Sequence, residues 1–183
     1  MKSAAEEAEL EVAKVRNAFV ALFRLQPEVR TSEKAVSHQT STTPELTIVS
    51  RDVEVTRDAM HTWWGSTKII RLRAVYRVRA GFDLSQRFQV QLANLTVAVT
   101  VPRAKILSLE PTLTQIEELR DGLWNKIQAE DINRELNKMS EMAKAKSEPL
   151  KEEAEKTFRE LLAQKIGDQN FRLEFIPDTT LPR

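Results

Sequence analysis

The chain has 183 residues, enough for one folded domain with appendages and a sizeable hydrophobic core. Its formal net charge of +1 gives no overall field that favours nucleic acid or a membrane, and the absence of cysteine excludes disulfides, thiol nucleophiles and thiolate metal sites. Charged residues make up 30% of the chain, and no apolar run approaches the roughly 18 residues that span a bilayer.

Residues 3–25 are predicted to form a helix, because apolar residues recur at alternating spacings of three and four, the heptad pattern. We call this row the heptad seam, and its members are Ala5, Ala8, Val12, Val15, Phe19 and Leu22. The pattern has two interpretations: an amphipathic helix that lies on its own domain, or a short coiled coil that joins subunits. The second interpretation predicts self-association through this helix.

The region after this helix contains the clearest strand patterns of the chain. Pro27 ends the helix, and the polar stretch 28–44, rich in Ser and Thr, is typical of a linker or a weak edge strand. An alternating pattern then begins and slips in phase near Ser50, which indicates a bulge. Over 68–80 apolar residues alternate with arginines, and the pattern breaks at Gly81.

Two shorter strands, 87–92 and 95–101, are predicted to complete the β region. The character of the chain changes after them. Thr114 and Glu117 have the spacing of a capping box, in which a hydroxyl and a carboxylate bond the first backbone N–H groups of a helix. We therefore predict a helix over 114–127.

A second helix is predicted to begin near Asp131. Pro149 lacks a backbone donor and clashes with a preceding helical turn, so it requires a kink or a new start near Ser147. The last helix is predicted to end at Gly167 in a left-handed conformation, before a final strand over 169–176. Its core stripe consists of Leu150, Ala154, Phe158, Leu161 and Ile166.

These elements predict an α+β fold. An antiparallel sheet spans about 46–101 and is completed by the strand that contains Phe171, with the helices of 114–166 packed on one face and a separate N-terminal amphipathic helix. The predicted parts are a helix over 1–27, a linker or edge strand over 28–44, an α+β domain over 45–177 and a tail over 178–183.

Four stretches together resemble the family catalogued as domain of unknown function 4230. They are Ala80-Gly-Phe-Asp-Leu84, the strand into Val99-Thr-Val-Pro102, Ala104-Lys-Ile-Leu107, and the helix that contains Ala154 and ends at Ile166-Gly167. The likeness covers about 46–175. It implies a mostly bacterial protein with a membrane anchor before this domain, and it transfers no site, because no activity, cofactor or catalytic residue is established for the family. The chain shows no anchor, so we expect either a fragment that begins just after one or a relative without one.

The first candidate binding site is a row of arginines on the central strand. We call it the arginine row: Arg71, Arg73, Arg77 and Arg79. Eight basic residues and one acid lie between 68 and 107, a surplus that can attract the phosphates of lipid or nucleic acid. The row lacks interleaved aromatic residues for base stacking, and residues 110–160 supply thirteen acids against nine bases. We therefore favour an internally neutralised face, and nucleic acid is not an expected partner.

The register of the first hairpin bears on this choice. Gly65 and Ser66 suit a two-residue type II′ loop, which sets Trp64 opposite Thr67, so that opposed residue numbers sum to 131. The resulting pairs are Asp58 with Arg73, Glu54 with Arg77 and Asp52 with Arg79. This register predicts that most of the arginine row is neutralised by the neighbouring strand.

Trp63 and Trp64 at the same hairpin are a candidate contact for a protein partner or a membrane surface, and burial under a helix is the plainer alternative. Asp83 is interpreted as a turn residue that accepts backbone hydrogen bonds. His38 and His61 lie in different segments, so no metal site, cofactor or catalytic residue is predicted. The acids at a helix start are interpreted as favourable partners of the helix dipole; they are Glu130, Asp131 and Glu135.

Two functions fit this sequence. We predict a non-enzymatic interaction or scaffold domain, tethered near a membrane by the expected anchor and self-associating, with a protein partner that the sequence does not specify. The alternative is a domain that binds lipid headgroups or nucleic acid through the arginine row. Retention on heparin that falls with salt favours the alternative, and concentration-dependent oligomers without such retention favour the scaffold.

Overall fold

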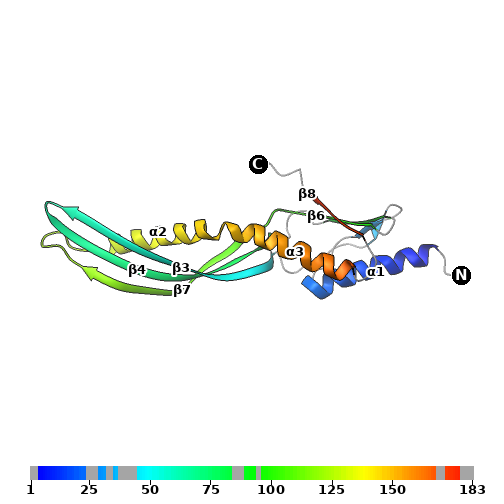
Figure 1. Cartoon of the computed structure of the whole chain (residues 1–183), viewed down its shortest axis with the longest axis horizontal. Coiled ribbons are helices and arrows are strands. Elements are labelled where there is room, and N and C mark those ends of the chain that lie inside the picture. The colour runs from blue at the N-terminus through cyan, green and yellow to red at the C-terminus, as the bar shows by residue number, and fades with distance from the viewer. Residues whose placement is uncertain are drawn as a thin grey trace. The chain divides into compact units, whose positions relative to one another are not determined.

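The computed structural model describes residues 4–23, 29–31, 35–36, 45–83, 89–93, 96–167 and 172–177. Its helices are α1 (Ala4–Phe23), α2 (Ala129–Ser147) and α3 (Pro149–Gly167). Its strands are β1 (Val29–Thr31), β2 (Ala35–Val36), β3 (Glu45–Trp63), β4 (Ser66–Asp83), β5 (Gln89–Ala93), β6 (Thr96–Val101), β7 (Lys105–Arg120) and β8 (Arg172–Pro177) (Figure 1). The predicted α+β class, with an N-terminal helix and C-terminal helices that break at Pro149, is confirmed.

The described residues group into two compact units that are interleaved along the chain. Unit 1 contains 1–48, 81–105 and 152–183, and unit 2 contains 49–80 and 106–151. The continuous domain over 45–177 stays a prediction; both units take segments from this range, and α1 is part of unit 1. The physical reason is strand length: β3 and β4 have 19 and 18 residues, about three times the usual strand. Their two ends therefore enter different units.

Unit 1 is built on a five-stranded sheet in the order β2-β1-β5-β6-β8. β5 and β6 are antiparallel, with Val90 opposite Val99, whereas β6 and β8 are parallel, with Val99 opposite Phe175. The predicted weak edge strand within 28–44 corresponds to β1 and β2, which lie at one edge of this sheet. The remainder of that stretch lies outside the described residues.

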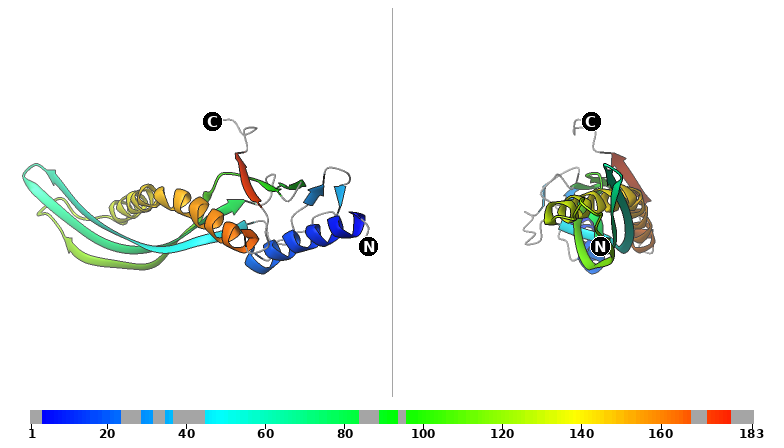
Figure 2. Two further views of the ribbon diagram at one scale, coloured as in Figure 1. Left: turned by 45° about the vertical axis from the view of Figure 1, so that its right-hand side comes forward. Right: turned by 90° about the vertical axis from the view of Figure 1, so that its left-hand side faces the viewer.

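Helix α1 buries one face within unit 1. Val15 and Phe19 have no exposed surface in the single chain, Val12 is buried and Leu22 is half-buried. The side chains of the first two members of the heptad seam lie outside the described part of the chain. Figure 2 shows α1 beside the end of α3, which belongs to the same unit. The described seam is thus covered by its own chain, and self-association through α1 stays a prediction.

Unit 2 consists of the three-stranded sheet β3-β4-β7 with α2 along one face (Figure 1). Alternate residues of β4 are buried: Ile70, Leu72, Ala74, Tyr76 and Val78. Met139 and Ala143 of α2 are buried as well. The alternation that predicts a strand with one buried face is therefore confirmed, and the arginines lie on the opposite, solvent-facing side.

The predicted helix over 114–127 is wrong. The chain is a strand to Arg120, and the capping-box pattern at Thr114 and Glu117 caps nothing. Pairing with β4 decides the outcome, because a ladder along a 16-residue strand outweighs a weak local preference for helix. Pro111 fits this assignment, since β7 is an edge strand and can leave one donor unpaired. The actual helix start lies at Gln128, whose backbone N–H donates to Asp131 at 2.9 Å.

Two details of α3 also differ from prediction. Leu161 is 38% exposed and Leu162 is fully buried instead, because the buried positions follow a spacing of four from Leu150. Gly167 lies in the last turn of α3 without a positive φ, so the predicted left-handed end is wrong. The final strand is confirmed over Arg172–Pro177, with Pro177 as its last residue, and the predicted positions 169–171 lie outside the described residues.

Gly81 lies inside β4 and does not end it, contrary to prediction. A Cβ atom added at Gly81 would overlap the carbonyl oxygen of Leu46. Glycine is required here because two backbones approach closely, as is common for glycine within strands. Gly81 therefore interrupts the alternating sequence pattern because packing requires a glycine there, and the strand continues through it.

Replacement of Gly81 by alanine is expected to destabilise the protein by about 2 kcal/mol or more, because the backbone of Leu46 must move. Chemical denaturation followed by circular dichroism measures the change. Gly167→Ala is the matched control, since no atom lies within 4 Å of the added Cβ there, and alanine is favoured in a helix by up to about 1 kcal/mol. Equal stability of the two variants contradicts the close approach at Gly81.

Candidate functional site

The hairpin that joins β3 to β4 closes through Trp64 and Gly65. These residues have φ of 48° and 73°, and a two-residue loop with two positive φ angles is a type I′ turn. The predicted type II′ loop at Gly65 and Ser66 is therefore wrong. Trp63 and Ser66 flank the turn, so opposed residue numbers sum to 129 and not to 131.

Cross-strand contacts agree with this register. The hydroxyls of Thr62 and Thr67 lie 2.9 Å apart. Asp58 and Asp52 pair with arginines two positions nearer the turn than predicted, and Glu54 reaches diagonally across the strands to an arginine four positions nearer. The observed pairs are Asp58 with Arg71 at 2.9 Å, Glu54 with Arg73 at 2.7 Å and Asp52 with Arg77 at 3.0 Å.

Each member of the arginine row therefore faces a carboxylate. Arg71 also lies 3.1 Å from Glu118 of β7, and Arg79 lies 4.0 Å from Glu110 of the same strand. The hydrogen bond and the charge of Arg77 hold the pKa of Asp52 below its ordinary value. The expectation of a neutralised face agrees with these contacts, although the individual pairs differ, and an anionic ligand has no unpaired row to bind.

The tip of the hairpin exposes all three tryptophans of the chain. Trp63 is 60% exposed, Trp64 83% and Trp124 61%, and the neighbouring Leu123 is 79% exposed. We call these four residues the aromatic tip. The rings of Trp63 and Trp64 meet edge to face, with centroids 6.4 Å apart. Predicted burial under a helix does not occur, and Trp124 is a member that the sequence analysis missed.

The loop after β7 is fastened to the hairpin by hydrogen bonds, which brings Trp124 to the turn. The indole Nε1–H of Trp124 donates to the carbonyl of Trp64 at 3.4 Å, and its backbone N–H donates to Ser66 Oγ at 3.3 Å. The side-chain amide of Asn125 donates to the carbonyls of His61 and Ser66 at 2.9 and 3.4 Å. Figure 1 shows the turn and this loop at the same end of unit 2.

Trp64 combines exposure with an unfavourable backbone. It is the one non-glycine residue with positive φ among the described residues. A left-handed conformation costs an ordinary L-residue about 1–2 kcal/mol, and Asn or Gly is the usual choice in this turn. Because an 83% exposed side chain regains little through packing, this placement of tryptophan points to a function.

Trp64→Asn is expected to raise the free energy of unfolding by about 0.5–1 kcal/mol, because asparagine tolerates the left-handed conformation. Thermal or denaturant unfolding followed by circular dichroism measures the change. Trp63→Asn is the matched control, since Trp63 ends β3 and has no positive φ. If Trp64→Asn is destabilising while the control is neutral, tryptophan is a structural requirement of the turn and the functional argument fails.

A set of charged residues, which we call the buried ion network, lies beneath the tip between the sheet and α2. Its buried members are Lys68, Asp131 and Glu135, and their partly exposed partners are Arg57, Arg134 and Lys138. Lys68 Nζ lies 2.6 Å from Asp131 Oδ2 and 3.4 Å from the carbonyl of Lys126. Hydrogen bonds from Lys68 and the backbone of Gln128 hold the pKa of Asp131 far below its ordinary value. This pair ties the first turn of α2 and the tip loop to β4.

Glu135 is the most buried member of this network, with no exposed surface. Its carboxylate accepts hydrogen bonds from Arg57 at 2.8 Å and Lys138 at 2.9 Å, and His61 Nε2 lies 3.7 Å away. Burial raises the pKa of Glu135, but these hydrogen bonds outweigh it and lower the pKa to about 2. The interpretation of Asp131 and Glu135 as partners of the helix dipole is therefore incomplete, because both are buried in ion pairs. Their spacing of four with Met139 and Ala143 was the signal for burial.

A comparison with protein-family models decides the classification. The model described as "Protein of unknown function (DUF4230)" matches residues 35–172, about three quarters of the chain. The chain belongs to the DUF4230 family. No curated protein matches it, and no solved structure matches it. The matched segment includes the whole of unit 2, so the aromatic tip and the buried ion network lie within the DUF4230 region.

Other candidates in this DUF4230 chain are not binding sites on the geometry described. Asp83 forms an ion pair with Lys105 at 2.7 Å, and its predicted role in a turn stays a prediction, because 84–88 lie outside the described residues. The described residues contain no group of three or more His, Asp or Glu side chains that can hold a metal ion, and His38 lies outside them. None of the described helices is long and apolar enough to cross a membrane.

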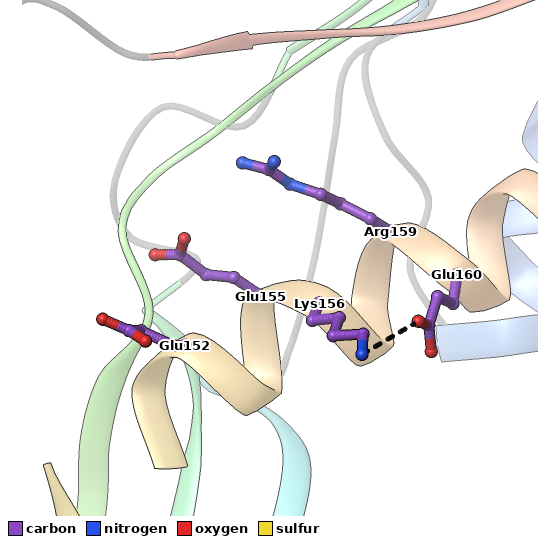
Figure 3. A pocket seen from close by; sticks show the side chains of 5 residues that line it. All are labelled: Glu152, Glu155, Lys156, Arg159 and Glu160. Atoms are coloured by element: carbon purple, nitrogen blue, oxygen red, sulfur yellow. Dashed lines mark ion pairs between the residues drawn. The ribbon is translucent and has the colours of Figure 1, made fainter. Parts of the chain in front are cut away.

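A surface hollow on α3 is also weak as a ligand site. Its five lining residues all come from this one helix: Glu152, Glu155, Lys156, Arg159 and Glu160 (Figure 3). Glu155 accepts a hydrogen bond from the backbone of Ala104, and Arg159 lies over the ring of Phe175 at 5.3 Å. These side chains already have structural partners within unit 1.

Proposed function

We propose that this DUF4230 chain is a non-enzymatic interaction domain that binds its partner through the aromatic tip. The observation that carries the proposal is the exposure of all three tryptophans at one end of unit 2, with Trp64 held in an unfavourable conformation. Exposed tryptophan is rare on surfaces without partners and common at interfaces. The fastened loop supports the proposal, because a pre-organised surface loses less entropy on binding.

The absence of cysteine makes a direct test possible. Leu123→Cys places one thiol at the tip and leaves every tryptophan in place, and Glu141→Cys places one on the exposed side of α2. In native cells, maleimide labelling at position 123 is expected to be several-fold slower than in the purified protein. Labelling at position 141 is expected to proceed at the same rate in cells as in the purified protein. Equal accessibility of position 123 in cells and in buffer overturns the proposal.

Tethering to a bacterial membrane is a second part of the proposal, and it rests on the DUF4230 resemblance. The encoding gene and the cellular fraction test it. An apolar segment of about 20 residues before this chain, with the protein in the membrane fraction, supports tethering. A gene without such a segment, whose product stays in the soluble fraction, contradicts it.

Self-association through α1 is also proposed, in a restricted form. Because Val15 and Phe19 are buried in the single chain, a second subunit has to meet outward residues of α1 such as Leu10, which is 48% exposed. Light scattering over a range of concentrations tests this, with Leu10→Asp as the variant. A monomer at every concentration rules it out.

A further inference from the structure

We propose that the aromatic tip inserts into the interfacial region of a lipid bilayer. This inference rests on the proposed function, because it names the occupant of the same surface. It concerns only unit 2, whose tip residues come from the β3–β4 turn and the loop after β7.

The tip is apolar without interruption. The segments 63–65 and 122–124 contain three tryptophans, one leucine and two glycines and no charged residue. The bordering charges, Asp121 and Lys126, lie 3.5 Å from each other. Tryptophan is enriched at the bilayer interface because its ring is apolar while its N–H is polar. A charge-free end bordered by a neutral ion pair fits that environment, where an unpaired charge is costly.

The size of the patch favours a bilayer over a protein partner. The exposed fractions of the three tryptophans and Leu123 correspond to on the order of 500 Å², taking about 200 Å² or a little more for each aromatic side chain. A stable protein complex buries about 800 Å² on each partner. The tip is also a turn beside a loop. A small projecting patch gains contact on all sides when it enters a fluid interface.

The electrostatics of the tip predict how binding depends on lipid and salt. Beside the tip, Arg120 lies 3.6 Å from Glu118, and Lys126 lies 3.5 Å from Asp121. With these charges paired, association is driven by apolar contact and not by anionic lipid. We therefore expect binding to neutral vesicles that changes little with salt.

Tryptophan fluorescence, excited selectively, reports on this site alone, because every tryptophan of the chain lies at the tip. With unilamellar vesicles of dioleoylphosphatidylcholine, the emission of the full chain is expected to shift to shorter wavelength and to be quenched by brominated phosphatidylcholine. Co-sedimentation with the same vesicles gives the affinity. Trp64→Asn and Leu123→Asn are each expected to weaken it by about tenfold, whereas the exposed Leu161→Ala on α3 is expected to leave it unchanged.

The inference is overturned if vesicles cause no shift, if the two tip variants bind with the same affinity as the parent chain, or if binding requires phosphatidylserine and disappears in high salt. A blue shift that follows protein concentration without lipid also overturns it, because the occupant is then a second copy. If the protein does not bind vesicles while position 123 is protected from labelling in cells, the occupant is a protein. The proposed interaction function then holds, and the bilayer inference does not.

Discussion

Phe158→Ala is expected to lower the free energy of unfolding by about 3–5 kcal/mol, the largest effect of any single truncation considered for unit 1. Phe158 of α3 is fully buried, and its ring centroid lies 4.9 Å from that of Phe82 and 6.4 Å from that of Phe175. Truncation removes contacts to β4 and β8 at once and leaves a cavity between them. Urea denaturation followed by circular dichroism measures the loss.

Two further variants make this result specific. Leu161→Ala, three residues along the same helix, removes a 38% exposed side chain and is expected to cost less than about 1 kcal/mol. Phe158→Leu retains most of the volume and is expected to cost less than the alanine variant. If Phe158→Ala costs no more than Leu161→Ala, the three rings do not form the core of unit 1.

The second large effect concerns the buried ion network of unit 2. Arg57→Met is expected to cost about 3 kcal/mol, because Glu135 then remains buried with one hydrogen-bond donor fewer. The double variant Arg57→Met with Glu135→Met is expected to recover most of the loss, since no carboxylate is left without its partner. Additive losses in this double-mutant cycle would show that the two side chains do not interact.

The pH dependence of stability follows from Glu135 with a defined sign. Its pKa is lowered in the folded state from 4.5 to about 2, so its stabilising contribution is present above about pH 4.5 and is lost as the pH falls toward 2. Asp131 has a lowered pKa and acts in the same direction. Glu135→Gln is expected to be less stable than the parent chain at pH 7 and to lose less stability between pH 4.5 and 2. A parallel loss in both proteins contradicts the assignment.

The network and the aromatic tip are physically connected. Lys68 binds both the Asp131 carboxylate and the carbonyl of Lys126, which follows the loop that carries Trp124. A weaker network is therefore expected to loosen the tip. Through this connection the buried Lys68 and Asp131 hold the loop that carries Trp124 in place beneath the tip.

Much of the β architecture follows from local pattern. Alternation along β4 predicted which residues are buried and placed the arginines with the acids of β3 on the solvent face. It did not decide the register, because registers that differ by two keep every side chain on the same face. The turn decided it: Trp64 adopts a positive φ, against its own preference, and the partners of Asp58 and Asp52 move by two positions.

The sequence by itself determined the α+β class, the helices α1, α2 and α3, and the faces of β3 and β4, because these depend on periodicity within a few neighbouring residues. Tertiary structure alone decided the strand over 114–120, where pairing with β4 overrides a helical pattern. It also decided the aromatic tip. Trp124 lies 60 residues from Trp64 in the chain, and only the hydrogen bonds between loop and turn bring these side chains together.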